Sequence, residues 1–210
     1  MIIVGAKGFA KEILQVLLDN NYPEKICFFD DVNLDIGETL YDQYPILKNE
    51  KEVVKFFESN NSFVLGLGEP LLRKKMYDKF LQLGGSCKSV ISKRANLGQH
   101  EVTIAEGTLI LPGVNISNSV RIGKGCIIYY NSNITHDCSV GNFVEISPSV
   151  NILGRVEIGS YVKLGSNSTI LPDVRIGNNV VVGAGSVVTK DVFDNVTVVG
   201  IPAKVIKTHL

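Results

Sequence analysis

The sequence predicts two domains, an N-terminal α/β domain and a C-terminal parallel β-helix, and three observations support this prediction. An aliphatic residue recurs at every sixth position from Ile104 to Val188. Before this stretch, short apolar runs alternate with helix-like segments. After it, the segment that contains Pro202 breaks the period. A chain of 210 residues is long enough for two modest domains.

The six-residue period defines the C-terminal fold. A small or β-branched residue follows each aliphatic position by four residues, and no step is skipped. The aliphatic positions are Ile104, Ile110, Ile116, Ile122, Ile128, Ile134, Val140, Ile146, Ile152, Ile158, Leu164, Ile170, Ile176, Val182 and Val188. A period of six fits neither an amphipathic helix nor an alternating strand. It is typical of a hexapeptide β-helix, in which three hexapeptides form one triangular coil and coils stack about 4.8 Å apart.

The first ninety residues alternate between buried strands and helices, which predicts a small, mostly parallel sheet flanked by helices. The expected strands are Met1–Val4, Ile26–Phe29, Phe63–Gly68 and Ser86–Ile91. The expected helices are Phe9–Leu18, Glu50–Ser59 and Pro70–Leu83.

A glycine-containing turn, Gly5-Ala6-Lys7-Gly8, lies between the first strand and the first helix. Backbone N–H groups at such a helix start form a cradle for anions. Asp30 and Asp31 follow the second strand, where a nucleotide-binding α/β unit contacts the nucleoside. The turn lacks the full dinucleotide-binding fingerprint, and the alternative is that the two aspartates only open a turn. We expect a Rossmann-like nucleotide-binding domain.

One hexapeptide differs from the others in its chemistry. His136 is the only histidine among the repeats, it occupies an outward-facing corner, and Asp137 follows it. One interpretation is a surface histidine beside a carboxylate. The other is a general base, in which the acid fixes one tautomer of the imidazole and makes it more basic.

Composition excludes several classes of function. The net formal charge is zero and no long run of like charges occurs, so neither nucleic acid nor a membrane is an expected partner. Met1 leads directly into an apolar strand, so no signal peptide is expected. The four cysteines lack metal-site spacing, and Cys126 and Cys138 fall on inward positions of the repeat. We therefore expect a cytoplasmic protein that needs no metal.

Nearly the whole chain resembles the bacterial sugar O- and N-acetyltransferases, a group within the hexapeptide-repeat acyltransferases. The group includes the sialic acid O-acetyltransferases and the bacillosamine-pathway N-acetyltransferase of 4-amino-sugar nucleotides. The matching motifs are Gly5–Gly8 with Lys11, Phe29–Asp31, Gly66–Gly68 with Arg73, His136–Cys138, Ile146–Pro148 and Val199–Ala203.

The resemblance implies a left-handed β-helix, acetyl-CoA as cosubstrate and a homotrimer. It implies that His136 is the general base, that Asp137 is its acidic partner, and that the backbone amide of Gly154 contacts the thioester carbonyl. Family members commonly have a second histidine nine residues after the first, which contacts acyl-CoA; Glu145 occupies that place here.

The resemblance also places the sugar nucleotide on the N-terminal domain. The candidate substrate-binding residues are Gly5, Lys7, Gly8, Asp30, Asp31, Gly68 and Arg73. The family's turn often has a histidine where this chain has Phe9.

The period itself suggests a path for acyl-CoA, because residues eighteen apart stack at one corner of successive coils. This places Gly154, Pro172 and Lys190 in a column with His136. We expect the thioester near His136 and the phosphates near Lys190. An ordinary turn glycine and an ordinary surface lysine are the alternative.

We predict an acetyl-CoA-dependent N-acetyltransferase for a UDP- or dTDP-linked 4-amino-4,6-dideoxy sugar, used in surface polysaccharide or glycan biosynthesis. O-acetylation of sialic acid or a related sugar is the alternative, and a non-catalytic binding solenoid is a more distant one. The predicted segments are residues 1–91 for the nucleotide-sugar domain, 92–103 for a linker, 104–198 for the β-helix and 199–210 for a C-terminal cap.

Overall fold

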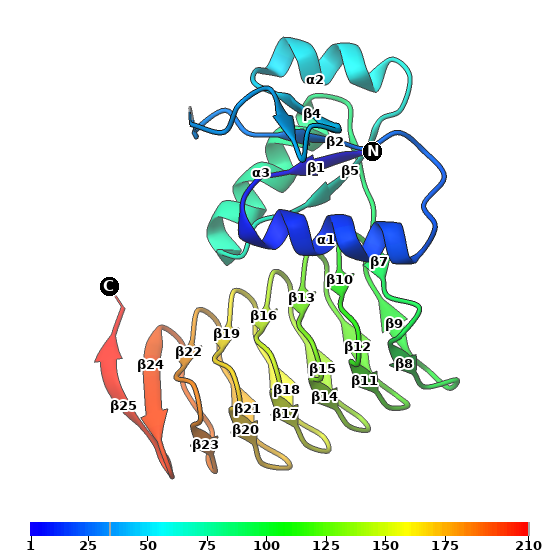
Figure 1. Cartoon of the computed structure of the whole chain (residues 1–210). Helices are drawn as coiled ribbons and strands as arrows, with labels where there is room; N and C mark the ends of the chain where they lie inside the picture. Colours follow the sequence, from blue (N-terminus) through cyan, green and yellow to red (C-terminus); the bar gives the residue numbers. More distant parts are fainter. Residues whose placement is uncertain (34, 210) are drawn as a thin grey trace. The chain divides into compact units, whose positions relative to one another are not determined.

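The computed structural model describes residues 1–33 and 35–209, which divide into two compact units, Met1–Val90 and Ile91–Leu210 (Figure 1). Leu34, in the predicted nucleotide-sugar domain, and Leu210, at the end of the predicted cap, lie outside the described residues.

The first unit contains a sheet with the strand order β3-β4-β2-β1-β5-β6. Its strands are β1 (Ile2–Val4), β2 (Cys27–Phe29), β3 (Thr39–Leu40), β4 (Tyr44–Leu47), β5 (Ser62–Leu65) and β6 (Ser86–Cys87). All neighbours pair in parallel except the edge pair β3–β4, which is antiparallel. The sequence analysis did not anticipate β3 and β4. The predicted sheet flanked by helices is present, with this extra antiparallel edge.

The helices of this unit are α1 (Gly8–Asp19), α2 (Glu50–Phe57) and α3 (Pro70–Gln82), as the sequence predicts to within two residues. Helix α1 packs closely on the end of β5. A Cβ atom on Gly66 would lie 2.8 Å from the Cβ of Ala10, so only glycine fits there. Phe80 of α3 lies against Phe29 and Phe63, with ring centroids 5.1 and 5.2 Å away. These contacts fix the carboxyl ends of β1, β2 and β5 between α1 and α3.

The second unit is a left-handed parallel β-helix with three sheets, and most of its strands are only two residues long. The first sheet contains β7 (Val90–Ile91), β10 (Leu109–Ile110), β13 (Ile127–Ile128), β16 (Glu145–Ile146), β19 (Lys163–Leu164), β22 (Val181–Val182), β24 (Val196–Gly200) and β25 (Ala203–Thr208). The second contains β8 (Asn96–Leu97), β11 (Asn115–Ile116), β14 (Asn133–Ile134), β17 (Asn151–Ile152), β20 (Thr169–Ile170) and β23 (Val187–Val188). The third contains β9 (Thr103–Ile104), β12 (Arg121–Ile122), β15 (Ser139–Val140), β18 (Glu157–Ile158) and β21 (Arg175–Ile176).

Strand partners are eighteen residues apart, as in the pairs Ile116–Ile134 and Ile152–Ile170. The predicted aliphatic positions from Ile110 to Val188 are buried and form one continuous core together with the small residues that follow them. Ser132 and Ser168 are buried at the inward small positions as well. The hexapeptide pattern therefore predicted both the coil length and the side chains that fill it.

The turns between sheets share one backbone feature. From Ile104 to Val182, the third residue after each aliphatic position has a positive φ, for example 57° at Ser119, 61° at Asp137 and 61° at Arg155. Glycine, Asn and Asp tolerate this left-handed conformation best. Because these turns repeat it, residues eighteen apart at a corner point in similar directions.

The β-helix differs from the prediction at both ends. Residues 92–103, predicted as a linker, contain β8 and the start of β9, which pair with β11 and β12. The coils therefore begin before Ile104. At the other end, the strand offset falls from eighteen to sixteen residues, since Ile176 bridges Val192. The final strands β24 and β25 form an antiparallel hairpin, and β24 also pairs with β22. The predicted cap is thus part of a hairpin that extends the first sheet.

Candidate functional site

His136 lies in the turn that leads from β14 in the second sheet to β15 in the third. Two backbone hydrogen bonds connect this turn to its neighbouring coils. The N–H of Asp137 donates to the carbonyl of Asn118 (3.2 Å), and the N–H of Arg155 donates to the carbonyl of His136 (3.1 Å). The turn is thereby held by the coils on both sides, which fixes the backbone position of His136.

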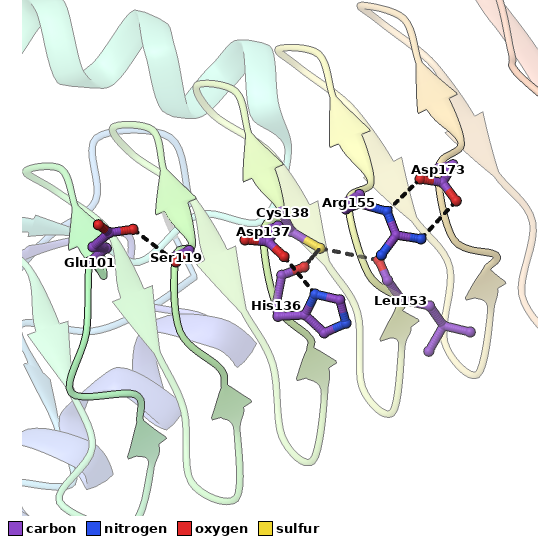
Figure 2. A network of polar contacts seen from close by, with 8 residues as sticks. All are labelled: Glu101, Ser119, His136, Asp137, Cys138, Leu153, Arg155 and Asp173. Carbon is purple, nitrogen blue, oxygen red and sulfur yellow. Dashed lines mark hydrogen bonds and ion pairs between the residues drawn. The ribbon is translucent and has the colours of Figure 1, made fainter.

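The side chains of His136 and Asp137 contact each other, with Nδ1 of the imidazole 2.7 Å from Oδ2 of the carboxylate (Figure 2). Each side chain is 54% exposed. With the proton on Nδ1, the imidazole donates to the carboxylate and leaves Nε2 as a free base. This is the arrangement that general-base catalysis requires.

Gly154 lies beneath the imidazole, one coil further along the chain. A Cβ atom at this position would lie 2.6 Å from Cε1 and 2.8 Å from Nε2 of His136. The glycine is therefore needed to accommodate the ring. Within residues 1–33 and 35–209, the backbone N–H of Gly154 has no hydrogen-bond partner. This N–H group can donate to a ligand oxygen when the imidazole ring of His136 moves away from it.

Cys138 is directed into the core. Its thiol donates to the carbonyls of Leu153 (3.1 Å) and His136 (3.5 Å) (Figure 2). Burial raises the pKa of the Cys138 thiol, and the charge of Asp137 acts in the same direction. The thiol is therefore protonated near neutral pH and is a poor nucleophile.

The other members of the predicted acyl-CoA column have different positions. Pro172 is exposed and lies at the same corner as Gly154, one coil further along the chain. The N–H of the next residue, Asp173, donates to the carbonyl of Gly154 (3.0 Å), which aligns the two turns. Lys190 is exposed but belongs to the turn that is two residues shorter than the others. The turn that carries Lys190 therefore differs in shape from the turns that carry His136, Gly154 and Pro172.

Glu145 begins β16 in the first sheet, where it pairs in register with Ile127 and Lys163. The turn of His136 connects the second and third sheets. The two residues therefore belong to different sides of the same prism, and one chain does not bring them together.

In the first unit, Asp30 organises the loop after β2. Its carboxylate accepts hydrogen bonds from the backbone N–H of Val32 (3.2 Å) and Asn33 (2.9 Å) and from the Asn33 side chain. Burial opposes ionisation, but these hydrogen bonds and one from the Ala6 backbone keep the pKa of Asp30 below its ordinary value. Asp30 thus ties the Gly5–Gly8 turn to β2, and its oxygens are already engaged.

Asp31 is paired with Lys79 of α3 (3.2 Å), whose amino group also contacts Glu50 (3.1 Å) and lies over the ring of Phe29. Although burial opposes it, hydrogen bonds to Glu50 and Asp31 raise the pKa of Lys79. Only the fold shows that Lys79 reaches the end of β2.

The start of α1 is open to a ligand. Lys7 is its N-cap residue, makes no side-chain capping bond, and no acidic residue occupies the first turn. A Cβ atom on Gly8 would meet nothing within 4 Å. Lys7 itself makes a long contact with Asp35 (3.7 Å), with both side chains largely exposed. By contrast, Asn49 caps α2 through the backbone N–H of Glu52. The first turn of α1 therefore lacks a side-chain cap and has open space at Gly8, which suits the approach of an anion.

Arg73 lies inside the first unit. The side chain is completely buried, and its guanidinium donates to the carbonyls of Leu67 (3.3 Å) and Gly68. It therefore supports the loop after β5 and does not face solvent. Gly68 has open space around its Cα, so this loop can approach a ligand closely.

These elements border a groove of about 170 Å³ at the carboxyl ends of β1, β2 and β5. Gly5, Asp30 and Asp31 line it from the predicted set, and Leu67, Leu72 and Met76 add an apolar wall. Ligands of parallel α/β sheets bind at this edge. The volume is below the range of roughly 300–1,000 Å³ for whole drug-sized ligands, so it suits one part of a larger ligand.

Two family models match the chain. Residues 1–80 match the PglD N-terminal domain, and residues 137–171 and 161–190 match the bacterial transferase hexapeptide repeats. Among curated proteins, no sequence has a significant match to this chain.

Solved structures resemble the chain over nearly its full length. PerB from Caulobacter crescentus, in complex with CoA and GDP-perosamine, is 27% identical with a TM-score of 0.88, covering 98% of this chain and 96% of PerB. WeeI from Acinetobacter baumannii AYE is 27% identical with a TM-score of 0.89, covering 98% of each chain. The acetyltransferase domain of PglB from Neisseria gonorrhoeae, in complex with acetyl coenzyme A, is 22% identical with a TM-score of 0.89 and 98% coverage of each chain, and it shows the shared fold.

The left-handed β-helix with a histidine–carboxylate pair at a coil corner defines a hexapeptide-repeat acyltransferase. The match of residues 1–80 to the PglD N-terminal domain and the likeness of nearly the whole chain to PerB and WeeI agree with this class. These matches confirm the resemblance inferred from the sequence and disfavour a non-catalytic solenoid.

Two further findings concern the described residues. No group of three or more His, Cys, Asp or Glu side chains there could hold a metal ion. No helix there combines the length and apolar character needed to cross a membrane, and the longest, α3, has 13 residues.

We predict that Gly154→Ala lowers kcat about 10- to 100-fold, because the new Cβ displaces the imidazole and small misplacements of catalytic groups have costs of this size. The ring is half exposed and can move outward, so the melting temperature should change little. Steady-state kinetics and thermal unfolding check this together. Wild-type kcat in a folded variant would contradict the packing role of Gly154.

Proposed function

We propose that the enzyme transfers the acetyl group of acetyl-CoA to the amine of a UDP- or dTDP-linked 4-amino-4,6-dideoxy sugar, for surface polysaccharide or glycan biosynthesis. The His136–Asp137 pair carries this proposal, because its geometry suits removal of a proton from an attacking amine. The likeness to PerB, which was solved with CoA and GDP-perosamine, supports a nucleotide-linked sugar. Two other structures of the perosamine N-acetyltransferase carry a substitution of one histidine.

The reaction would be a direct transfer. The sugar amine attacks the thioester carbonyl, and Nε2 of His136 accepts the proton that the amine loses. The Asp137 carboxylate, 2.7 Å from Nδ1, would stabilise the resulting imidazolium. The tetrahedral intermediate then collapses, the C–S bond breaks, and the CoA sulfur leaves with the proton from His136. The products are the N-acetylated sugar and free CoA thiol.

The thioester would lie at the Gly154 end of the column. The backbone N–H of Gly154 has no partner within residues 1–33 and 35–209, and a donor at this place would stabilise the developing oxyanion by several kcal/mol. The pantetheine arm would continue past Pro172, and Lys190 remains our candidate for the phosphates of CoA.

The sugar nucleotide would bind the first unit. Its phosphates would use the uncapped start of α1, where Gly8 leaves open space and Lys7 supplies a positive charge. The nucleoside would occupy the groove at Gly5, Asp30 and Asp31. Arg73 would contribute by holding Gly68 and its loop in place.

The proposal is tested by thiol release from acetyl-CoA with UDP-, dTDP- and GDP-linked 4-amino sugars and with free sialic acid. We expect release with an amino-sugar nucleotide, and none with sialic acid. In the same assay, His136→Ala should lower kcat by about 10²–10⁴ while acetyl-CoA binding is retained, as for other general bases. Release with sialic acid alone would support O-acetylation instead, and wild-type turnover of His136→Ala would refute the catalytic assignment.

A second prediction separates the two substrates. Gly8→Val places a branched side chain where the phosphates would approach α1, in space that is empty in the structure. The apparent KM for the sugar nucleotide should rise at least about tenfold through loss of backbone anion contacts, whereas the KM for acetyl-CoA should stay constant. The melting temperature of Gly8→Val, compared with that of the wild type, controls for damage to the fold of this unit. Equal changes in both KM values would argue against the assignment.

We also propose a homotrimer, as the resemblance implies. Within one chain Glu145 lies on a different side of the prism from His136, so it could join an acyl-CoA site only from a neighbouring subunit. Cyclic assemblies of this kind place active sites between subunits. Sedimentation equilibrium at micromolar concentration should give about three chain masses, and a fully active monomer would refute the proposal.

A further inference from the structure

Three charged residues occupy equivalent turn positions on successive coils beside His136. Asp137, Arg155 and Asp173 are each eighteen residues apart, with φ values of 61°, 61° and 65°. Aspartate tolerates this left-handed conformation, whereas it is unusual for a long side chain such as arginine. The turn geometry therefore does not account for an arginine at this position.

Arg155 forms a two-point contact with Asp173. Its Nε lies 2.6 Å from Oδ1, and its Nη2 lies 2.9 Å from Oδ2. This bidentate geometry is the strongest form of the arginine–carboxylate interaction. Hydrogen bonding with Asp173, and then its charge, raise the pKa of Arg155 and lower that of Asp173. Figure 2 shows that the guanidinium is directed toward Asp173, on the side away from Asp137.

Asp137 is the other carboxylate within reach of Arg155. Adjacent coils are about 4.8 Å apart, and an arginine side chain spans that distance in either direction along the column. Asp137 already contributes to the raised pKa of Arg155, though less than Asp173 does. A guanidinium released from Asp173 would therefore have Asp137 as its nearest alternative partner.

The described residues at the equivalent turn positions of the preceding coils do not supply a competing cation. On the preceding coil, Ser119 occupies the equivalent turn position and donates to Glu101 (2.9 Å; Figure 2). The Cys138 thiol beside the pair is buried, with its pKa raised. Among the described residues at the turn position of Asp137 on successive coils, Arg155 is the one positive charge. The orientation of its guanidinium therefore determines whether the Asp137 carboxylate contacts His136 alone.

We propose that Asp173 is a positioning residue for acetyl transfer, which holds the guanidinium of Arg155 away from Asp137 and so reserves the Asp137 carboxylate for His136. The inference rests on the proposed role of His136 as the general base. Asp173 would act through Arg155 and would not touch the substrate. Both side chains are more than half exposed, so water screens their charges and the effect should be moderate.

The test compares Asp173→Asn, Arg155→Gln and the double variant. Asparagine keeps the left-handed turn but loses the two-point contact. In Asp173→Asn we expect kcat to fall about three- to tenfold, a small part of a general base's contribution. The acid limb of the kcat profile should move to lower pH by roughly half a unit, because a nearby positive charge disfavours imidazolium. For Arg155→Gln and for the double variant, kcat should lie within about twofold of the wild-type value, because neither variant retains the competing cation. The acid limb of the kcat profile should lie at the wild-type pH in both.

A second readout does not depend on the substrate. In NMR titrations, the midpoint for the Cε1–H signal of His136 should move to lower pH in Asp173→Asn and return in the double variant. A purely structural role would instead give lower melting temperatures in both single variants and no rescue. Wild-type kinetics and titration in Asp173→Asn, or a double variant as impaired as Asp173→Asn, would overturn the inference. If His136→Ala itself keeps wild-type turnover, the proposed function fails, whereas the NMR comparison still tests the contact.

Discussion

The eighteen-residue register of the β-helix is the constraint on which the rest of the site depends. Each strand is too short to be stable alone, and neighbouring coils stabilise it by parallel pairing, as between Ile134 and Ile152. The same register stacks the corners, so that the imidazole of His136 lies over Gly154 and Arg155 follows Asp137. A catalytic pair thus rests on a backbone that the core holds in place.

The sequence predicted this part of the fold well because the signal is periodic. Aliphatic residues at every sixth position can all be buried only in coils of eighteen residues, and Cys138 could be assigned to the core from its phase alone. The His136–Asp137 contact was also predictable, since adjacent residues at one turn need no long-range information. Strands Thr39–Leu40 and Tyr44–Leu47 were missed. They are short, and Pro45 weakens the strand signal, although it precedes the two residues of β4 that pair with β2, Ile46 and Leu47.

Other features depend on where the chain brings distant residues together. Arg73 matched a family motif, yet the fold buries it against the carbonyls of its own loop. Lys79 resembled a surface lysine until α3 placed it beside Asp31. The shortened turn before Val192 breaks the stacking that the sequence extrapolated to Lys190. In each case, one residue type fits several environments, and only tertiary contacts select among them.

The central claim is that Asp137 holds His136 in the form that leaves Nε2 free as a base. The ¹⁵N chemical shifts of the His136 ring at neutral pH test it most directly. The account predicts a proton on Nδ1 and an unprotonated Nε2, with this preference lost in Asp137→Ala. A proton mainly on Nε2, or shifts that do not respond to removal of the Asp137 carboxylate, would contradict it.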